Sequence, residues 1–392
     1  MPLARRLAEK SVNRRYDFII AGGGLAGLSL AYHLIQSDLR ERSILIVDPQ
    51  RKEQNDRTWC FWTDQPTLFD EIVCRSWHQL QFKSADWESV IDLRDYRYKM
   101  IRGIDFYRFV QRALSNRENV GFAHARVDRI ADDEDGVRVF AGAQMFRGRW
   151  AFDSRFDLPQ FKPEPSRYHY LQQHFKGWWI ETPNECFDPQ TATLFDFRTE
   201  QKNGVRFFYV LPLSERQALI EYVLLGCAEN ARELTTYIET VLGIQDYRIL
   251  AREGGVNPLT DYPLPRRAGK RVMNIGVAGG RVKPTSGYAF TRIQQDSAAI
   301  VDSLRRTDAP FDVSTDSPYY RLCDSLMLQL MCRHGAGIPS LFADLFKNNP
   351  VERVFRFLDE RASPRENLAL MASLPPGKFL QAFFRIKMSR RI

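Results

Sequence analysis

The stretch Tyr16-Asp-Phe-Ile-Ile-Ala-Gly-Gly-Gly-Leu-Ala-Gly27 decides the fold of this chain. Its first part, Asp17–Ala21, is a short apolar run that is typical of a buried strand. The glycines that follow fit the pattern G-x-G-x-x-G. In that pattern Gly22 allows a tight turn, Gly24 lets the backbone approach a pyrophosphate, and Gly27 lets a helix pack closely on the strand. The stretch therefore predicts a strand, a ligand-binding turn and the start of a helix.

The residues beyond this turn complete the unit. Apolar side chains recur at helical spacing at Leu28, Ala31, Leu34 and Ile35. A second apolar strand, Ile44–Val47, ends at Asp48, whose carboxylate can accept hydrogen bonds from a ribose. The N-terminus of the intervening helix would offer free N–H groups to phosphates. This arrangement predicts a Rossmann-type α/β unit that binds a dinucleotide, and its place near the start of the chain favours FAD over NAD.

Composition and net charge limit the classes of protein to which this chain can belong. With 392 residues the chain is long enough for two domains, and 44% hydrophobic with 27% charged residues is typical of a globular protein. No run approaches the roughly 18 unbroken apolar residues of a membrane-spanning helix, and residues 1–15 form a basic arm without the apolar segment of a signal peptide. The net charge of +8 suits an ordinary solvated surface or attraction to an anionic membrane, and no nucleic-acid motif is visible.

Cysteine and histidine usage argues against a metal centre. The six cysteines and six histidines show no CxxC pair, no HExxH pair and no other spacing of metal ligands. We therefore expect no metal site. Without an export signal, reduced thiols in a cytosolic compartment are the default expectation.

A shift in composition at Phe156, where prolines become frequent, predicts a second domain. Four runs in it are typical of long antiparallel strands: Lys176–Thr182, Ala192–Arg198, Val205–Leu211 and Gln217–Leu225. The expected order is an FAD-binding part over 1–155, an antiparallel substrate domain over 156–252, a second FAD-binding part over 253–310 and a C-terminal helical region over 311–392. Within the first part, Trp77–Ile91 predicts two short strands and Ala125–Ile130 another.

Glu221 is the most informative residue of the second domain. Period-2 alternation places it with Leu219 and Val223 on one face of a strand, with apolar neighbours on both faces. If it is buried, desolvation raises its pKa and keeps it available as a neutral acid near pH 7. A salt-bridged or rim position is the alternative. Asp196, between two phenylalanines, and Asp153, at a strand end, are weaker candidates.

A second glycine-rich stretch follows an apolar strand over Val272–Val277. Gly279 and Gly280 permit close approach of the backbone to a ligand, and Gly287 precedes a helix expected from about Tyr288. The N-terminus of that helix could stabilise negative charge on a flavin ring. An ordinary loop is the alternative.

Aromatic residues are frequent in Thr58–Trp62 and throughout the second domain. They are typical of a hydrophobic core. They would also suit a tunnel for a long apolar ligand, in which the faces of the aromatic rings could stabilise a cation. The apolar helical stripes after residue 311 suit core-facing helices, or a lid that dips into a membrane interface and admits a lipid.

Taken together, these motifs resemble the bacterial lycopene cyclases of carotenoid biosynthesis, FAD-dependent flavoproteins related to the plant lycopene cyclases. The resemblance rests on five motifs: the glycine fingerprint with Asp48, Arg57–Trp62, Phe152–Arg155, the segment from Pro212 to Glu221, and the segment from Gly279 to Phe290. It implies a flavoprotein monooxygenase- or reductase-like fold with an antiparallel substrate domain and C-terminal helices. The plant enzymes carry two adjacent acids at the carboxylate site, whereas Glu221 is followed here by Tyr222.

The resemblance also implies a function. Glu221 corresponds to the family's proposed catalytic carboxylate, and Gly22, Gly24, Gly27, Asp48 and the stretch Gly279–Gly287 correspond to its flavin-binding pattern. The implied enzyme is an intramolecular lyase or isomerase that cyclises the ends of lycopene without net redox change. Reduced FAD would stabilise a cation, NADPH would reduce the flavin, and the protein would dock on the membrane that holds its substrate.

Two other function classes remain open at this point. A flavin monooxygenase, or a polyene desaturase or reductase, on the same fold would consume NADPH or oxygen in proportion to product. A non-catalytic carrier of prenyl lipids would bind no flavin, and the intact glycine fingerprint argues against it.

Overall fold

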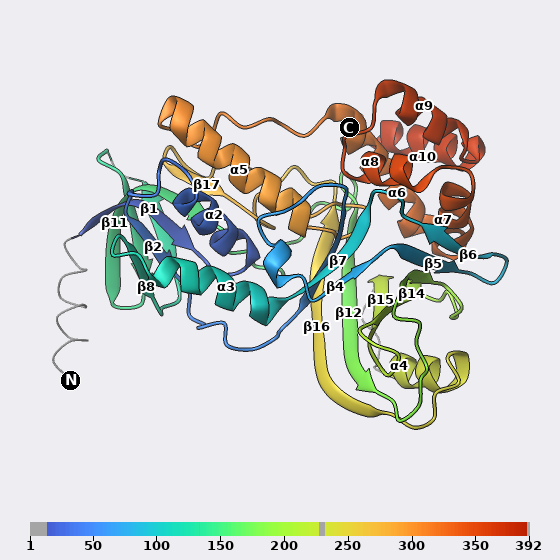
Figure 1. Ribbon diagram of the computed structural model, residues 1–392. Coiled ribbons are helices and arrows are strands. Elements are labelled where there is room, and N and C mark those ends of the chain that lie inside the picture. Colours follow the sequence, from blue (N-terminus) through green and yellow to red (C-terminus); the bar gives the residue numbers. More distant parts are fainter. Residues whose placement is uncertain (1–13, 133, 227–231, 390–392) are drawn as a thin grey trace.

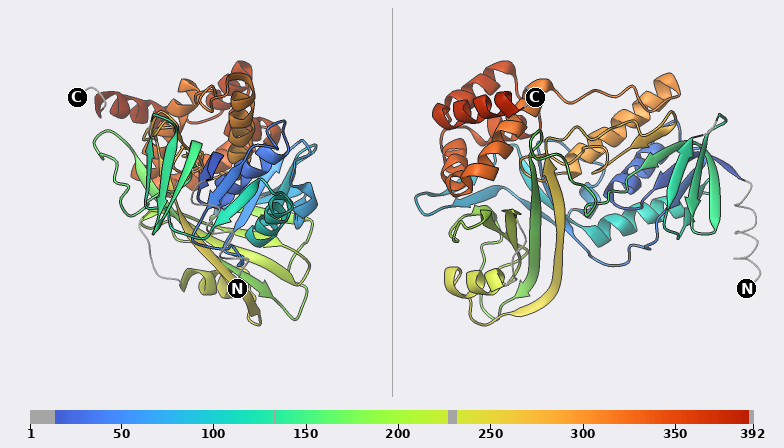
Figure 2. Two further views of the ribbon diagram at one scale, coloured as in Figure 1. Left: turned by 90° about the vertical axis from the view of Figure 1, so that its left-hand side faces the viewer. Right: turned by 180° about the vertical axis from the view of Figure 1, so that it is seen from behind.

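A computed structural model describes residues 14–132, 134–226 and 232–389 (Figure 1). Most of the predicted basic arm and Cys227 lie outside the described residues. The described chain forms a sheet-and-helix body at one end, a second large sheet at the other, and a group of C-terminal helices beside that second sheet (Figures 1 and 2).

The first sheet is built on the predicted strand–turn–helix–strand unit. Its parallel strands are β8 (Val120–Ala123), β2 (Ile44–Val47), β1 (Arg15–Ala21) and the end of β11 (Gln144–Asp153), with the short β17 (Val272–Asn274) beside β11. All four residues of β2 are buried, which explains its continuous apolar run. Because β17 follows some 120 residues after β11, the chain leaves this sheet and returns to it.

The same sheet continues as an antiparallel hairpin through β10 (Val137–Ala141) and β9 (Arg129–Asp132). The prediction of a strand over Ala125–Ile130 is wrong over its first four residues. These four residues precede β9, and the backbone N–H of Asp128 donates a hydrogen bond to the carbonyl of Phe140 just before the regular strand pairing begins.

Helices cover one face of the first sheet, namely α2 (Leu25–Ile35), α3 (Gly103–Ser115) and α5 (Phe290–Thr307) (Figure 1). The opposite face packs against side chains of β9 and β10. The predicted strand Val272–Val277 ends early, because only Val272–Asn274 pairs with β11, and the predicted helix near Tyr288 begins at Phe290.

The second sheet has the order β16–β12–β15–β14–β13–β5–β6. Its four predicted strands are present and antiparallel: β12 (Tyr170–Glu181), β13 (Thr191–Asp196), β14 (Gly204–Pro212) and β15 (Gln217–Gly226). The strands β13, β14 and β15 are neighbours in chain order, which confirms the predicted meander.

Three further strands join this sheet from outside the predicted meander. The long β16 (Arg248–Thr260) pairs with β12 along one edge, while β5 (Gln79–Lys83) and β6 (Glu88–Asp92) extend the other edge. β5 and β6 confirm the two short strands expected over Trp77–Ile91. A small separate sheet of β3 (Thr58–Thr63), β7 (Arg97–Arg102) and β4 (Arg75–Trp77) links the two large ones. The division of the chain into domains stays a prediction.

Helical segments cover both faces of the second sheet. The C-terminal helices α6 (Pro318–His334), α7 (Ile338–Lys347), α8 (Val351–Leu358), α9 (Pro364–Ala372) and α10 (Pro376–Ser389) pack on one face (Figure 2). The other face carries α4 (Arg232–Thr236) and the π-helical turn Tyr237–Val241. Short 3₁₀ turns lie at Asp70–Ile72 and Gly335–Gly337.

Local sequence explains where α9 begins. The hydroxyl of Ser363 accepts the N–H of Glu366, and the Glu366 carboxylate accepts the N–H of Ser363, which completes a capping box. Of the helices described, none is long and apolar enough to cross a membrane.

Candidate active site

The glycine turn after β1 has the geometry that its sequence predicts. Gly22 has a φ of 101°, and a Cβ built there would lie 2.2 Å from the hydroxyl of Ser154. A Cβ on Gly27 would lie 1.9 Å from the carbonyl oxygen of Gly22. A Cβ on Gly24, by contrast, would meet no protein atom within 4 Å. Gly22 and Gly27 are therefore required by the fold, whereas Gly24 leaves space open beside the turn.

The open side of this turn suits a phosphate-bearing group. α2 begins at Leu25 with Gly24 as its N-cap, and among the residues that the structure describes no side chain caps this end of the helix. Those donors and the positive end of the helix dipole are the features that bind pyrophosphates. Asp48 braces the turn, since its carboxylate accepts the N–H of Gly23 at 2.6 Å and that of Gln50 at 2.7 Å. Its contact with a ribose stays a prediction.

A cavity of about 320 Å³ connects this turn to the second sheet. Residues from the second sheet, from the small sheet and from the loops and helices beside the first sheet line it, among them Gly24, Thr58, Trp59, Glu221, Gly287 and Tyr288. In the aromatic stretch Thr58–Trp62, Trp59 lines the cavity, whereas Phe61 and Trp62 are buried in two different cores. Two predicted site residues far apart in sequence, Gly24 and Glu221, thus share one cavity.

The glycines of the second glycine-rich stretch line two different cavities. Gly287, with a φ of 76°, and Gly276, with a φ of 60°, line the cavity beside Glu221. Gly279 and Gly280 line a separate cavity of about 480 Å³ instead. A Cβ on Gly279 would lie 2.5 Å from the carbonyl oxygen of Asn274, so this glycine is needed for chain packing.

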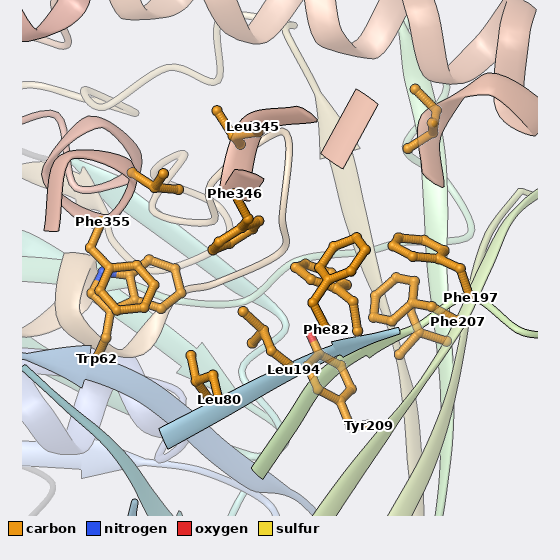
Figure 3. Close-up of a cluster of buried hydrophobic side chains, with 14 of the residues drawn as sticks. Trp62, Leu80, Phe82, Leu194, Phe197, Phe207, Tyr209, Leu345, Phe346 and Phe355 are labelled. Carbon is orange, nitrogen blue, oxygen red and sulfur yellow. The ribbon is translucent and has the colours of Figure 1, made fainter. Parts of the chain in front are cut away.

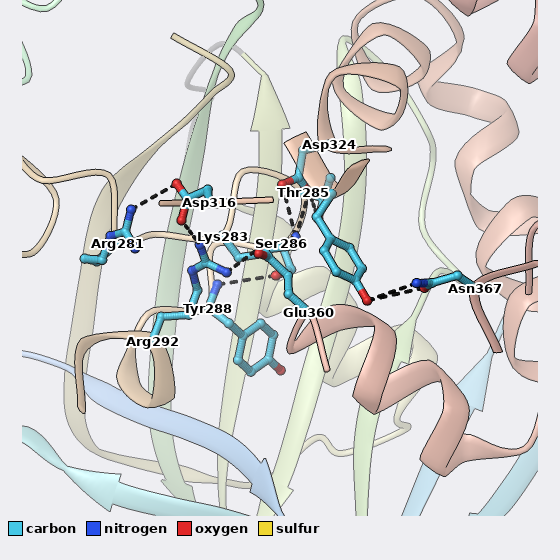
Figure 4. A network of polar contacts seen from close by, with 11 residues as sticks. Arg281, Lys283, Thr285, Ser286, Tyr288, Arg292, Asp316, Asp324, Glu360 and Asn367 are labelled. Atoms are coloured by element: carbon cyan, nitrogen blue, oxygen red, sulfur yellow. Dashed lines mark hydrogen bonds and ion pairs between the residues drawn. The ribbon is translucent and has the colours of Figure 1, made fainter. Parts of the chain in front are cut away.

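A buried polar network fixes the loop that carries these glycines (Figure 4). The ammonium of Lys283 donates to Asp324 at 3.0 Å and to Glu360 at 2.9 Å, and Arg292 donates to Glu360 at 2.7 Å. Burial acts to raise the pKa of Glu360, but Lys283 and Arg292 hold it below its usual value. These bonds tie the loop before α5 to α6 and to the turn after α8.

The structure confirms the predicted orientation of β15. The side chains of Leu219 and Val223, on the face of Glu221, pack with the C-terminal helices, whereas Ile220 and Tyr222 pack with α4. Glu221 lies opposite Gly177 of β12 and Tyr209 of β14. It therefore projects from the middle of the sheet and not from its rim.

The surroundings of Glu221 favour its neutral form. No hydrogen-bond partner for its carboxyl group is present among the residues that the structure describes, although Cys60, Tyr209 and Tyr288 line the same cavity. Burial raises the pKa of Glu221 well above its usual value, and the carboxyl of Glu253 raises it further. The ionised form of Glu221 is therefore disfavoured.

Glu253 is the acid that sequence reasoning missed. It lies on β16, only 8% exposed, and its Oε2 accepts the hydroxyl of Thr58 at 2.7 Å and the indole N–H of Trp179 at 2.8 Å. In the sequence it precedes Gly254 and Gly255, which suggests a turn, so no local signal marks it. Only the pairing of β12 with β16 brings it beside Glu221.

The two weaker acid candidates, Asp196 and Asp153, form ion pairs and hydrogen bonds within the protein. Asp196 is fully buried, but Arg198 binds it from two nitrogens and the hydroxyl of Tyr237 donates to it at 2.6 Å. Asp153 pairs with Arg155 at 2.8 Å. Both carboxylates are already occupied by chain contacts.

A second cavity, of about 90 Å³ and mostly apolar, adjoins the first between the sheet and the C-terminal helices. The two share Gln173, Tyr209, Ser286 and Tyr288 in their linings. Figure 3 shows the aromatic side chains of this region, with Phe197 and Phe207 of the sheet region below Leu345 and Phe346 of α7. Trp62 stacks on Phe355 of α8, with ring centres 4.7 Å apart.

Comparison with solved structures identifies the fold. A flavoprotein/dehydrogenase from Cytophaga hutchinsonii superposes with a TM-score of 0.66 at 11% identity, over 96% of this chain and 100% of that one. The predicted flavoprotein fold, with parallel and antiparallel sheets and C-terminal helices, is therefore confirmed.

Comparison with characterised sequences gives the family. A lycopene beta-cyclase from Pseudescherichia vulneris is 26% identical over 75% of this chain and 75% of its own length. A chloroplastic neoxanthin synthase from Solanum tuberosum is 24% identical over 74% of this chain, and the match spans 60% of that longer protein. The family model described as "Lycopene cyclase protein" matches residues 17–384, and the chain therefore belongs to the lycopene cyclase family.

Proposed function

We propose that this protein is a lycopene β-cyclase that closes the acyclic ends of lycopene to β-rings without net redox change. One observation carries the proposal: the partly buried acid Glu221 lines the cavity that runs from the glycine turn toward an aromatic, apolar cavity. An uncharged acid beside apolar walls suits proton transfer to a carbon–carbon double bond. The membership in the lycopene cyclase family and the bacterial relative support this substrate class.

The same cavity would hold FAD. Gly22, Gly24 and Gly27 would receive its pyrophosphate at the start of α2, with Asp48 beside them and Gly287 at the far end of the cavity. Gly279 and Gly280, which line the neighbouring cavity, would let the backbone approach the flavin. When bound and reduced, with NADPH as the reductant, FAD would supply negative charge near a cation.

Glu221 would handle the proton at both stages of the reaction. Its carboxyl proton adds to C2 of a ψ end and leaves a cation at C1. The C5=C6 electrons then bond C6 to C1 and move the cation to C5. Loss of the C6 proton to the Glu221 carboxylate forms the C5=C6 bond and restores the acid, so that atoms and electrons balance. The raised pKa of Glu221 suits the first step, and its ionised form suits the last.

Aromatic walls would protect and stabilise the cation. Tyr209 and Tyr288 face both cavities, and Phe195 and Phe207 lie beyond them. Ring faces attract cations, and the apolar lining excludes the water that would capture them. The rest of the polyene would extend between the sheet and the C-terminal helices.

A bulky residue in the second cavity should obstruct the polyene. Met371 of α9 lines this cavity, whereas its neighbour Ala372 is exposed. We expect Met371→Trp to lower kcat/KM for lycopene by roughly tenfold, equal to ~1.4 kcal/mol, without loss of flavin. Ala372→Trp is the matched control and should retain activity. Equal activities of the two variants, measured by chromatography of the pigments, would place the polyene elsewhere.

The lipid-soluble substrate requires contact with a membrane, and α10 offers a suitable surface. Leu380 and Phe384 are 56% and 61% exposed on it, while Ala382 and Ile386 are buried. Exposed basic side chains flank the apolar pair: Lys378, Arg385 and Lys387. An apolar strip with basic neighbours is typical of helices that lie on anionic lipid surfaces. We therefore propose a cytoplasmic protein that binds the membrane peripherally.

Removing that strip should weaken docking. We expect Leu380→Ser combined with Phe384→Ser to reduce binding to vesicles of phosphatidylcholine and phosphatidylglycerol about 100-fold or more, since each side chain loses ~1.5 kcal/mol or more of burial. Val90→Ser on β6, 51% exposed, is the control. Unchanged co-sedimentation of the double variant with vesicles would assign docking to another face.

Expression in a lycopene-accumulating bacterium tests the proposed function. The expected result is conversion of lycopene to a yellow-orange product of unchanged mass with one or two rings. Unchanged lycopene beside flavin-loaded protein would favour a redox enzyme or another polyene as substrate. Protein without flavin that retains lycopene would favour a carrier.

A further inference from the structure

The register of the second sheet brings two acids to the same point. Gly177 of β12 lies opposite Glu221 of β15 on one side and opposite Glu253 of β16 on the other. Directly opposed residues of antiparallel strands point to the same face. The two glutamates therefore project from one face of the sheet, with only a glycine between them.

That glycine leaves room for the acids to approach each other. A Cβ on Gly177 would lie 2.9 Å from Cγ of Glu253 and 2.9 Å from Cδ1 of Leu219. The side chain of Glu253 thus leans over Gly177, toward the strand that carries Glu221. A side chain at position 177 would separate the two carboxyl groups.

The two carboxyl groups differ in their hydrogen bonds. Oε2 of Glu253 accepts from Thr58 and Trp179, whereas its buried Oε1 has no hydrogen-bond partner in the part of the chain that the structure describes. Donors directed at a carboxylate stabilise its ionised form. Glu221 receives no such bond from the described residues, so the proton of the pair belongs on Glu221.

We infer that Glu221 and Glu253 form a carboxyl pair that holds one proton, in which Glu253 stays ionised and thereby keeps the proton on Glu221. Two like charges that face each other across one glycine oppose each other's ionisation, which is why such a carboxyl pair titrates as a unit. The inference rests on the proposed function in that Glu221 is the proton donor to the polyene. Glu253 itself is a positioning residue that acts through Glu221.

The other titratable groups around the pair do not replace Glu253. Burial raises the pKa of the Cys60 thiol and of the Tyr209 and Tyr288 hydroxyls, so these groups are neutral near pH 7. Burial raises the pKa of Glu253 above its usual value, although the hydrogen bonds from Trp179 and Thr58, and then the charge of Arg57, act to lower it. Glu253 is therefore the charge that acts on Glu221.

The variant Glu253→Gln tests the pair. Its amide oxygen still accepts from Thr58 and Trp179, but the charge is gone, so Glu221 should release its proton at lower pH. We expect the alkaline limb of the cyclisation pH profile to move down by about one unit, with about tenfold lower activity at pH 8 and little change at pH 6. Glu253→Asp keeps the charge and should retain the wild-type profile.

A spectroscopic titration separates this inference from the proposed function. In the infrared spectrum, the C=O band of a protonated carboxyl group should persist to alkaline pH in the wild type, disappear in Glu221→Gln and titrate at lower pH in Glu253→Gln. If the wild type forms no rings, the proposed cyclase function is wrong. The infrared titration would still test whether Glu221 and Glu253 share one proton. An unmoved band and an activity loss equal at all pH values would overturn the pair, as would a profile displaced equally in Glu253→Asp.

Discussion

Glu221→Gln and Glu221→Ala are expected to abolish ring formation while the protein still binds FAD. Glu221 supplies the proton that starts cyclisation, and general acid catalysis contributes roughly 10²–10⁴-fold to a rate. The glutamine variant keeps the shape of the side chain, so its loss of activity would report the proton alone. Rates are measured by chromatography of carotenoids, and bound flavin by its absorbance. A fully active variant would remove Glu221 from the mechanism.

Stability supplies a control for this prediction. The pKa of Glu221 is raised in the folded state above its usual value of 4.5, so the folded protein binds this proton more tightly than the unfolded chain. That contribution is fully present below pH 4.5 and is lost as the pH rises toward the raised pKa. Glu221→Gln should therefore raise Tm by roughly 2 °C or more at neutral pH, and less in acid. The exposed Glu200→Gln should change neither activity nor Tm.

Gly24→Val is expected to prevent FAD binding while the fold survives. A Cβ on Gly24 meets no protein atom within 4 Å, so the added side chain enters only the space beside the turn. That space is where a pyrophosphate would approach the start of α2. We expect FAD affinity to fall by roughly 100-fold or more, equal to ~2.7 kcal/mol. Flavin absorbance, circular dichroism and Tm against flavin-free wild type measure the two effects separately.

Two other glycines provide matched controls. Gly27→Val should lose both flavin and fold, because its Cβ would collide with the carbonyl of Gly22. Gly377→Val, at a position that also meets nothing within 4 Å but lies on α10, should keep both. Normal flavin content in Gly24→Val would contradict the assignment of this turn to the cofactor.

Local patterns in the sequence were enough for part of the fold and of the site. Period-2 alternation correctly placed Glu221 on the same face as Leu219, because a strand whose two faces pack against different layers must alternate. The glycine fingerprint likewise predicted β1, the turn and α2, because the turn at Gly22, with a φ of 101°, and the close contact of Gly27 with the carbonyl of Gly22 both lie within the fingerprint itself.

What the sequence missed depends on contacts between distant segments. Glu253 reaches Glu221 only because β12 pairs with both β15 and β16, and no local pattern reveals that register. β5 joins the second sheet by parallel pairing with β13, more than 100 residues later. The contact of Gly279 and Gly280 with a ligand stays a prediction; in the structure Gly279 packs against Asn274 and Gly280 has a φ of 72°.

The most direct test of the central claim is an isotope count on purified, flavin-reduced protein. The protein is equilibrated in D₂O, used in excess over lycopene in vesicles, and the product is analysed by mass spectrometry while NADPH is monitored. Redox-neutral cyclisation through Glu221 predicts a ring that carries deuterium at C2, no other change in mass, and NADPH use that does not scale with product. A ring without deuterium, a product that has gained oxygen or gained or lost a pair of hydrogens, or NADPH consumed in proportion to product would contradict it.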